Sequence, residues 1–130
     1  MKRDTREWVR FAEDDYDAAT TLLRRRKNPL RNGVGFHCQQ CAEKYLKARL
    51  IEAGLPVIKT HDLEALLISL LPVEPLWSAF LATAKHLTSY AVKFRYPGHV
   101  VTDADVKHAL ADCRSIRTEV RASLGLPKKR

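Results

Sequence analysis

The stretch richest in side chains that can do chemistry is residues 36–50, which read FHCQQCAEKYLKARL. Its small and apolar residues recur at helical spacing, and a neighbouring face of the same helix repeats polar residues at the same period, namely Gln40, Glu43, Lys44 and Lys47. Glu43 precedes Lys47 by one helical turn, the favourable order for an ion pair that supports a helix by about 0.2–0.5 kcal/mol. One face of this helix must therefore pack, and the other must pair internally or bind a partner.

Polar residues in and around this helix suit a nucleotide. Lysine, arginine and histidine donate hydrogen bonds to phosphate, and a tyrosine ring offers a surface on which a base can stack. The candidate binding residues are Lys44, Lys47, His61, Asp62, Arg95 and Tyr96. The alternative is a buried polar network that ties the helix to the loops, with Asp62 only capping the next helix. The sequence leaves both interpretations open.

Two of the three cysteines form a Cys38-x-x-Cys41 pair. Thiols at this spacing share one helical face, but a thioredoxin-like motif expects a preceding strand. A zinc site would need two further ligands, for example His37 or His61 with Cys113. Small buried cysteines pack on helices much as alanine does. We therefore expect packing in place of a metal or redox role, and we expect no cofactor.

The composition describes one domain. The chain has 130 residues, 45% of them hydrophobic and 29% charged, which is enough to bury a single core without disulfides or a structural metal. The first residues lack the apolar core of a signal peptide, and no run is apolar enough to cross a membrane. We therefore expect a cytoplasmic protein with reduced thiols and no membrane partner.

The charge is strongly basic. Lys and Arg number 23 against 15 Asp and Glu, a formal net charge of +8 that favours nucleic acid or a nucleotide as partner through long-range attraction. Much of the excess lies in residues 24–27 and 128–130. We expect a single domain over residues 1–126, followed by a solvated basic tail at residues 127–130.

Apolar residues recur at the helical period in five segments, and no segment alternates at period two over a convincing length. The expected helices cover about residues 5–25, 33–53, 60–71, 75–93 and 102–124. The first two should form an antiparallel hairpin. The prediction is an all-α fold, an up-and-down bundle of four long helices plus one short helix.

Capping and helix-breaking residues mark the ends of these helices. Asp4 or Thr5 can cap the first helix, and Asn28-Pro29 ends it. Gly54 is a stop signal for the second helix and Gly125 for the last, and Thr102 with Asp105 resembles a capping box at the start of the last. The aromatic residues of the helices are expected in the core or an interface, and they are Trp8, Phe11, Tyr45, Trp77 and Phe80.

Four features occur in a fixed order along nearly the whole chain: an amphipathic first helix, QCAEKYLKA at residues 40–48, Thr60-His61-Asp62-Leu63, and Arg95-Tyr96-Pro97. Together they resemble the HEPN domain family, in which a Gln-Ala-Ala-Glu-Lys-x-Leu-Lys-Ala helix precedes a His-Asp-Leu and an Arg-Tyr-Pro. The resemblance implies a helical domain that often dimerises and is often encoded beside a minimal nucleotidyltransferase. It also implies membership of a superfamily of nucleotide-binding proteins and metal-independent ribonucleases.

The ribonuclease branches of this family share an arginine and a histidine with four to six residues between them, usually at the start of a later core helix and completed by dimerisation. Arg31 and His37 fit this spacing, but Arg31 precedes the second helix and His37 lies in its first turn, whereas Arg95 and His99 are too close. In such a pair the imidazole can move protons and the guanidinium can stabilise phosphorane charge. Arg31 and His37 are therefore candidate catalytic residues, or else ordinary surface residues.

The resemblance also implies that a partner nucleotidyltransferase can transfer AMP to a HEPN tyrosine, for which Tyr90 and Tyr96 are candidates. Three hypotheses follow from the sequence. The first is a homodimeric nucleotide- or RNA-binding partner of a nucleotidyltransferase in a toxin–antitoxin or defence setting. The second is a metal-independent endoribonuclease that uses Arg31 and His37. The third is a structural dimer module without a ligand.

Overall fold

The structure is a computed structural model that describes residues 1–25 and 30–130, apart from the side chain of Val92. Its elements are α1 (Arg3–Leu23), α2 (Arg31–Glu52), α3 (Leu63–Leu70), the 3-10 helix η1 (Pro75–Phe80), α4 (Leu81–Arg95) and α5 (Asp103–Ser123). The described residues contain no strand, so the prediction of an all-α fold is confirmed. The predicted helix end at Asn28-Pro29 and the end of the basic cluster at residues 26–27 lie outside the described residues.

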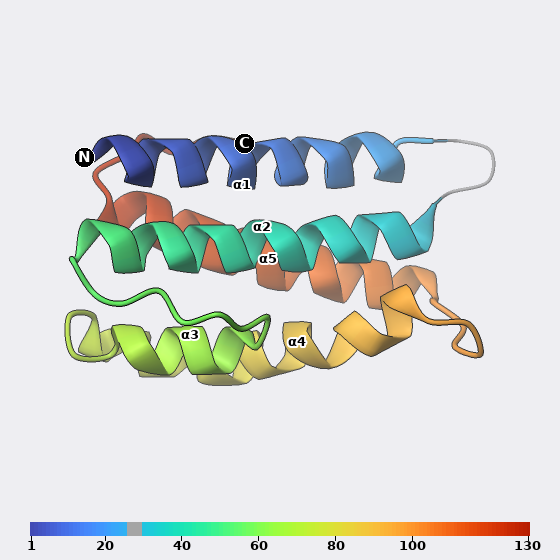
Figure 1. The fold of residues 1–130 in the computed structure, drawn as a ribbon. Helices are drawn as coiled ribbons and strands as arrows, with labels where there is room; N and C mark the ends of the chain where they lie inside the picture. The colour runs from blue at the N-terminus through green and yellow to red at the C-terminus, as the bar shows by residue number, and fades with distance from the viewer. Residues whose placement is uncertain (26–29) are drawn as a thin grey trace.

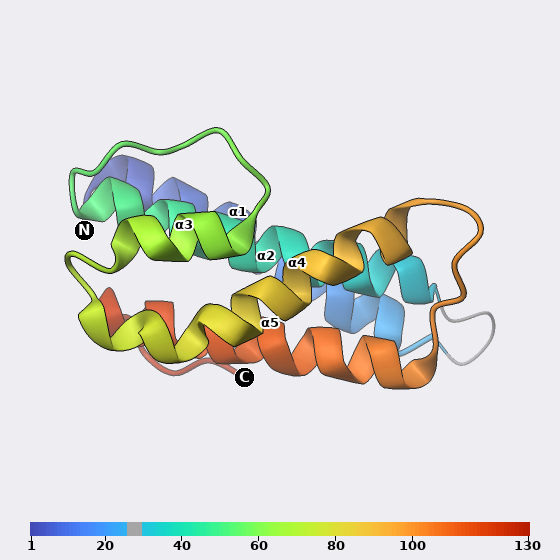
Figure 2. The same ribbon diagram turned by 90° about the horizontal axis from the view of Figure 1, so that it is seen from below.

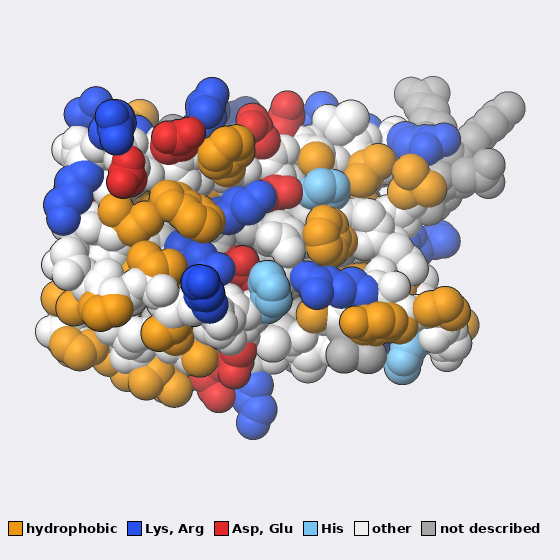
Figure 3. Space-filling model, viewed as in Figure 1, with side chains coloured by type: hydrophobic (Ala, Val, Ile, Leu, Met, Phe, Trp, Pro, Cys, Tyr) orange, Lys and Arg blue, Asp and Glu red, His pale blue; other side chains and the backbone are white. Residues whose placement is uncertain are grey.

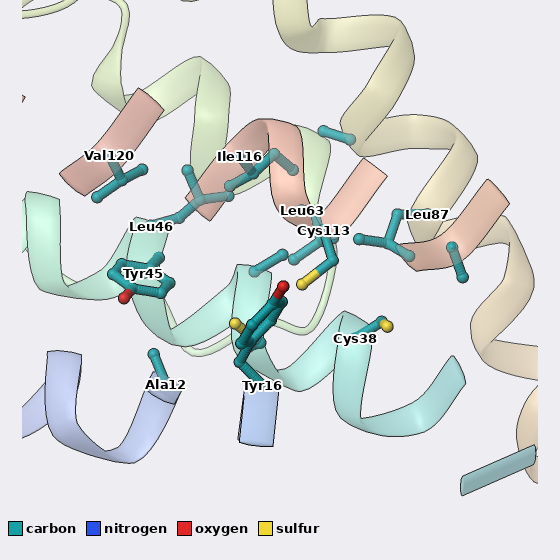
Figure 4. Close-up of a cluster of buried hydrophobic side chains, with 14 of the residues drawn as sticks. Ala12, Tyr16, Cys38, Tyr45, Leu46, Leu63, Leu87, Cys113, Ile116 and Val120 are labelled. Atoms are coloured by element: carbon teal, nitrogen blue, oxygen red, sulfur yellow. The ribbon is translucent and has the colours of Figure 1, made fainter. Parts of the chain in front are cut away.

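Helix α2 is the central element of the fold. It packs against α1, α3, α4 and α5, and it runs antiparallel to α1 as predicted (Figures 1 and 2). Core side chains from all five α-helices converge on its middle, as Ala12, Leu46, Leu63, Leu87 and Ile116 do in Figure 4. Because α2 is surrounded, its polar residues meet other elements of the chain, and most of them cannot simply face solvent.

Residues 53–62, the return segment, connect α2 to α3 along an extended path (Figures 1 and 2). The segment runs back beside α2, so α3 runs in the same direction as α2 (Figure 1). The return segment carries His61 to the middle of α2, where its imidazole meets Glu43. The long connection thereby positions one of the predicted binding residues.

Several predicted helix ends agree with the structure. Gly54 and Gly125 follow α2 and α5 with φ of 71° and 73°, and the backbone N–H groups there close both ends as in a Schellman motif. At the start of α5, the Thr102 hydroxyl accepts from the backbone N–H of Asp105 at 3.1 Å. The Asp105 carboxylate accepts from the N–H of Thr102 at 2.9 Å, which confirms the predicted capping box.

Two predictions about helix ends are wrong. Helix α1 begins after Lys2, so neither Asp4 nor Thr5 is its cap. Thr5 lies within the helix and is buried. Its hydroxyl donates to Glu52 at 2.9 Å, which ties α1 to the end of α2. The helix predicted from Pro75 divides into η1 and α4, since short 3-10 turns commonly precede α-helices.

The C-terminal segment, residues 127–130, lies against α5 (Figure 2). Arg121 donates to the carbonyl of Pro127 at 3.0 and 3.1 Å, and Arg117 Nη1 donates to the carbonyl of Lys129 at 2.6 Å. Two buried arginines therefore hold the backbone of this segment, while its four residues are themselves exposed to solvent. No helix in the described part of the chain is both long and apolar enough to span a membrane.

Candidate functional site

Asp15 on α1 joins two of the predicted residues of α2. Its Oδ1 atom lies 2.7 Å from His37 Nδ1, and its Oδ2 atom lies 2.5 Å from Lys44 Nζ. His37 and Lys44 are two helical turns apart and therefore share one face of α2. Because Nδ1 of His37 is committed to Asp15, Nε2 is the nitrogen through which the imidazole can act on a ligand.

Glu43 forms a second cluster of the same kind on the other flank of α2. Its Oε1 atom lies 2.8 Å from His61 Nδ1, and its Oε2 atom accepts from Lys47 Nζ at 3.2 Å. Gln39 Nε2 donates to Glu43 Oε1 at 3.3 Å and to the His61 carbonyl at 3.1 Å, which holds the return segment against α2. In both clusters a buried carboxylate holds one histidine, through Nδ1, and one lysine.

The two lysines have different surroundings. Lys47 is only 9% exposed, lies between Glu43 and Trp8, and places its Nζ 5.8 Å from the centroid of the indole ring. It serves mainly as the partner of a buried carboxylate, whose burial without one would be costly. Lys44 is more accessible, and an ammonium group that spends one N–H on Asp15 has two more to offer. Lys44 is thus the better phosphate ligand.

Arg95 extends the Asp15 cluster along the surface. Its guanidinium lies 5.2 Å from the centroid of the Phe36 ring, and this ring meets His37 edge-on at 5.3 Å between centroids. The following residue, Tyr96, is 57% exposed. Figure 3 shows basic, histidine and hydrophobic side chains interleaved across this side of the molecule. We call Phe36, His37, Lys44, His61 and Arg95 the binding face.

Two further predicted residues make contacts within the chain. Asp62 is the N-cap of α3, where its Oδ1 atom accepts from the backbone N–H groups of Glu64 and Ala65 at 3.0 and 3.3 Å. Arg31 Nε donates to Asp103 on α5 at 2.7 Å. Since His37 contacts α1, the Arg31 and His37 side chains of one chain engage different helices.

A third polar network joins α1, α2 and α5, and it shifts the pKa of several of its members. Glu13 accepts from Arg117 and from the Tyr45 hydroxyl, and Tyr45 in turn accepts from Arg121. Burial and the hydrogen bond to Glu13 raise the pKa of Tyr45 well above its ordinary range. Tyr45 is therefore a core residue, as predicted, and this network holds helices together.

The three cysteines lie in the core. Cys38, Cys41 and Cys113 are free and fully buried, as Figure 4 shows for Cys38 and Cys113. A hydrogen bond between Cys38 and Cys113, together with burial, raises the pKa of Cys38 far above that of a free thiol. Within residues 1–25 and 30–130, no three His, Cys, Asp or Glu side chains gather as a metal site would require. The Cys38-x-x-Cys41 spacing is used for packing.

Sequence reasoning missed Asp15 and the surroundings of Trp8. Asp15 occupies a position in the apolar stripe of α1, and an acidic residue at a buried position is a signal that it has a partner. Trp8 and Phe11 line an open groove of about 380 Å³ together with Asp4, Glu7 and Lys44. Neither aromatic residue is fully buried in the core.

Comparison with known proteins agrees with the resemblance seen in the sequence. The model of the HEPN domain family matches residues 5–123, a range that includes both carboxylate clusters and nearly every helical residue. Searches of curated proteins and of solved structures found no match.

Proposed function

Because the chain belongs to the HEPN domain family, we propose that this up-and-down helical bundle binds a nucleotide or RNA through the binding face. The observation that carries the proposal is a set of contacts between separate elements. Asp15 links Lys44 to His37, and the Phe36 ring links His37 to Arg95 at the end of α4. Glu43, next to Lys44 in α2, holds His61 of the return segment. Figure 3 shows Lys, Arg and His side chains, which carry hydrogen-bond donors, on this side of the molecule. Family membership suggests a nucleotide- or RNA-related function for such a face.

The chemistry of the binding face suits phosphate beside a base. Lys44 and Arg95 supply charged N–H donors, and His37 supplies Nε2. The Arg95 guanidinium lies over the Phe36 ring in a cation–π contact, and a guanidinium has five N–H donors to offer. Asp15 offsets part of the positive charge, so the long-range attraction comes from the whole chain, whose formal net charge is +8.

We further propose that the protein is a cytoplasmic homodimer that works beside a minimal nucleotidyltransferase in a toxin–antitoxin or defence setting. The resemblance of the sequence supports the setting and the partner. Exposed apolar side chains at Ile68, Val73 and Leu76, on and after α3, supply a surface of the kind that protein interfaces cover. Co-purification with the nucleotidyltransferase encoded by an adjacent reading frame tests the partnership, and its failure at moderate salt removes this part of the proposal.

Fluorescence anisotropy of a labelled single-stranded RNA, titrated at several salt concentrations, tests the binding face. We expect Lys44→Ala and Arg95→Ala each to weaken binding and to reduce the slope of log K against log salt by about 0.7, the value for one phosphate on a single strand. The matched control is Lys107→Ala, at an exposed lysine on α5, which should change neither the affinity nor the salt slope. If neither RNA nor nucleotides bind the wild-type protein at low salt, the proposal fails.

A metal-independent ribonuclease is a second candidate function. It is favoured by Asp15, which holds His37 through Nδ1 and so orients Nε2 to move a proton. Within one chain, Arg31 pairs with Asp103 of α5 and His37 contacts Asp15 of α1. The Arg31 of a second copy of the chain would therefore have to complete the pair with His37. RNA cleavage in EDTA that is lost in both His37→Ala and Arg31→Ala, with circular dichroism unchanged, would support it. Cleavage that survives both substitutions excludes these residues.

A further inference from the structure

The groove beside Lys44 is lined by four further side chains, all from α1: Asp4, Glu7, Trp8 and Phe11. It is open to solvent and has a volume of about 380 Å³. Building on the proposed function, we propose that this groove receives the guanine base of a nucleotide or of single-stranded RNA, with the adjoining phosphate at Lys44.

The aromatic side chains of the groove provide a surface on which a base can stack. Trp8 and Phe11 are three residues apart on α1 and therefore lie on the same side of the helix. Phe11 is 44% exposed, and Trp8 is only partly buried. Trp77 differs, because it is 2% exposed and its indole N–H donates to Glu119 at 3.1 Å. Trp77 is a core residue, whereas Trp8 presents ring surface to the groove.

Neighbouring contacts prepare the Trp8 ring for stacking. Lys47 Nζ lies 5.8 Å from the ring centroid, and the same Lys47 is held by Glu43. This cation–π contact restricts the ring and makes it less costly to order on binding. Base–aromatic stacking contributes enough that removal of the ring is expected to weaken binding by roughly 5- to 150-fold.

The charges of the groove select the kind of base. The carboxylates of Asp4 and Glu7 only accept hydrogen bonds, and the ammonium group of Lys44 only donates them. Arg3 and Arg10 lie 3.6 and 3.7 Å from these carboxylates in exposed ion pairs, which are weak and leave further acceptor sites on each carboxylate. A matching ligand offers N–H donors to the carboxylates and an anionic group to the lysine. Guanine presents a ring N–H and an amino group side by side, and a single carboxylate can accept both. Adenine and cytosine place an acceptor nitrogen beside their amino group, and uracil places its N–H between two carbonyl oxygens.

Lys44 connects the groove to the binding face. It lines the groove, and its Nζ atom is also held by Asp15, the residue that holds His37. A phosphate at Lys44 would therefore sit between the stacked base and the imidazole. The groove supplies recognition of the base, and the binding face supplies recognition of the backbone.

Fluorescence titration of a Trp77→Phe variant, in which Trp8 is the only tryptophan, tests the proposal. The probes are GMP, AMP, CMP, UMP and ribose 5-phosphate, together with the pentanucleotides UUGUU, UUAUU, UUCUU and UUUUU. We expect GMP or UUGUU to quench the fluorescence of Trp8 and to bind at least about tenfold more tightly than its uridine counterpart. The nucleotide and oligonucleotide arms decide whether the base arrives free or within RNA.

Variants of the groove, measured by calorimetry, complete the test. Trp8→Ala should weaken guanine binding by roughly 5- to 150-fold. Trp8→Phe should restore part of the lost affinity. Glu7→Gln with Asp4→Asn should remove the preference for guanine. The matched control is Asp14→Asn, two turns from Glu7 on the same side of α1 and outside the groove, which should preserve it. Circular dichroism checks that each variant is folded.

Three results would overturn the inference. If RNA binding depends on Lys44 and Arg95 but is indifferent to Trp8→Ala and to base identity, the groove is not a base site, while the proposed function stands. If no probe binds, both fail. If Trp8→Ala leaves affinity unchanged but dissociates a dimer in light scattering, the groove is an interface between copies of the chain.

Discussion

Arg117 on α5 holds Glu13 on α1 through two hydrogen bonds, of 2.7 Å from Nε and 2.8 Å from Nη2. The Tyr45 hydroxyl of α2 donates to the same carboxylate at 2.5 Å. Three helices are therefore joined at one partly buried carboxylate. Its pair with Arg117 is charge-assisted and bidentate, the strongest common type of side-chain hydrogen bonding. This network holds the scaffold on which the binding face rests.

The Glu13 carboxylate should make the stability of the protein depend on pH. Burial by itself raises the pKa of Glu13, but hydrogen bonds from Arg117 and Tyr45 outweigh burial and hold the pKa below its ordinary value of 4.5. The stabilisation is then complete above the unfolded pKa and is lost as the pH falls through the folded pKa. We expect the free energy of unfolding in urea to fall below about pH 4.5, and to fall less steeply in Glu13→Gln. Equal slopes would contradict this.

Removal of Arg117 should be far more damaging than removal of a neighbouring arginine. Arg117→Ala leaves the carboxylate of Glu13 without its main partner and frees the carbonyl of Lys129, so we expect a loss of about 3–5 kcal/mol in the free energy of unfolding. Arg114→Ala is the matched control, because Arg114 is exposed and, among the residues that the structure describes, its side chain donates to the Tyr16 hydroxyl alone, at 2.9 Å. Chemical denaturation of both variants measures the difference in their free energies of unfolding. Similar losses would contradict the structural role given to Arg117.

Gly35 allows α2 to approach α4 closely. A Cβ atom added there would lie 2.4 Å from ring atoms of Phe94, which is buried. Alanine normally favours a helix over glycine by about 1 kcal/mol, but overpacking a core costs about 1–3 kcal/mol. We expect Gly35→Ala to lower the thermal midpoint, and we expect Gly35→Ala with Phe94→Leu to recover part of the loss. A midpoint that rises in the single variant would show that the helices separate easily.

Asp62 should matter for stability and not for the ligand. Its side chain caps α3, and loss of such a cap costs about 1 kcal/mol. We expect Asp62→Ala to destabilise the protein by this amount, Asp62→Ser to retain most of the stability, and both to bind RNA as the wild type does at a temperature where all are folded. A variant that is stable but loses binding would place Asp62 among the ligand contacts.

The buried thiols should be unreactive in the folded protein. Burial and contacts among the cysteines raise the pKa of Cys38 and of Cys113, so little thiolate is present near neutral pH. We expect Ellman's reagent to titrate none of the three thiols rapidly in buffer and all three in concentrated urea. Rapid reaction of one thiol in buffer would indicate local opening of the core beside α2.

Most of the helices could be predicted because a helix is a local structure. The spacing of apolar residues, the capping box of Thr102 and Asp105, and the glycines at Gly54 and Gly125 act between residues a few positions apart. The predictions of helix ends failed where a side chain contacts a residue far away in the sequence. Thr5 did not cap α1 because its hydroxyl is engaged by Glu52 from the far end of the hairpin.

The candidate site, too, combines local features with contacts between residues far apart in the sequence. The sequence by itself determined an all-α domain of the HEPN family and the polar face of α2, since both depend on local period and on motifs. Only the tertiary structure decided that Asp15 pairs with His37 and Lys44, that Lys47 is largely buried, and that Trp8 lines a groove. These relationships depend on how α1 and the return segment pack against α2. Packing is set by contacts between residues far apart in the chain, which no local pattern encodes.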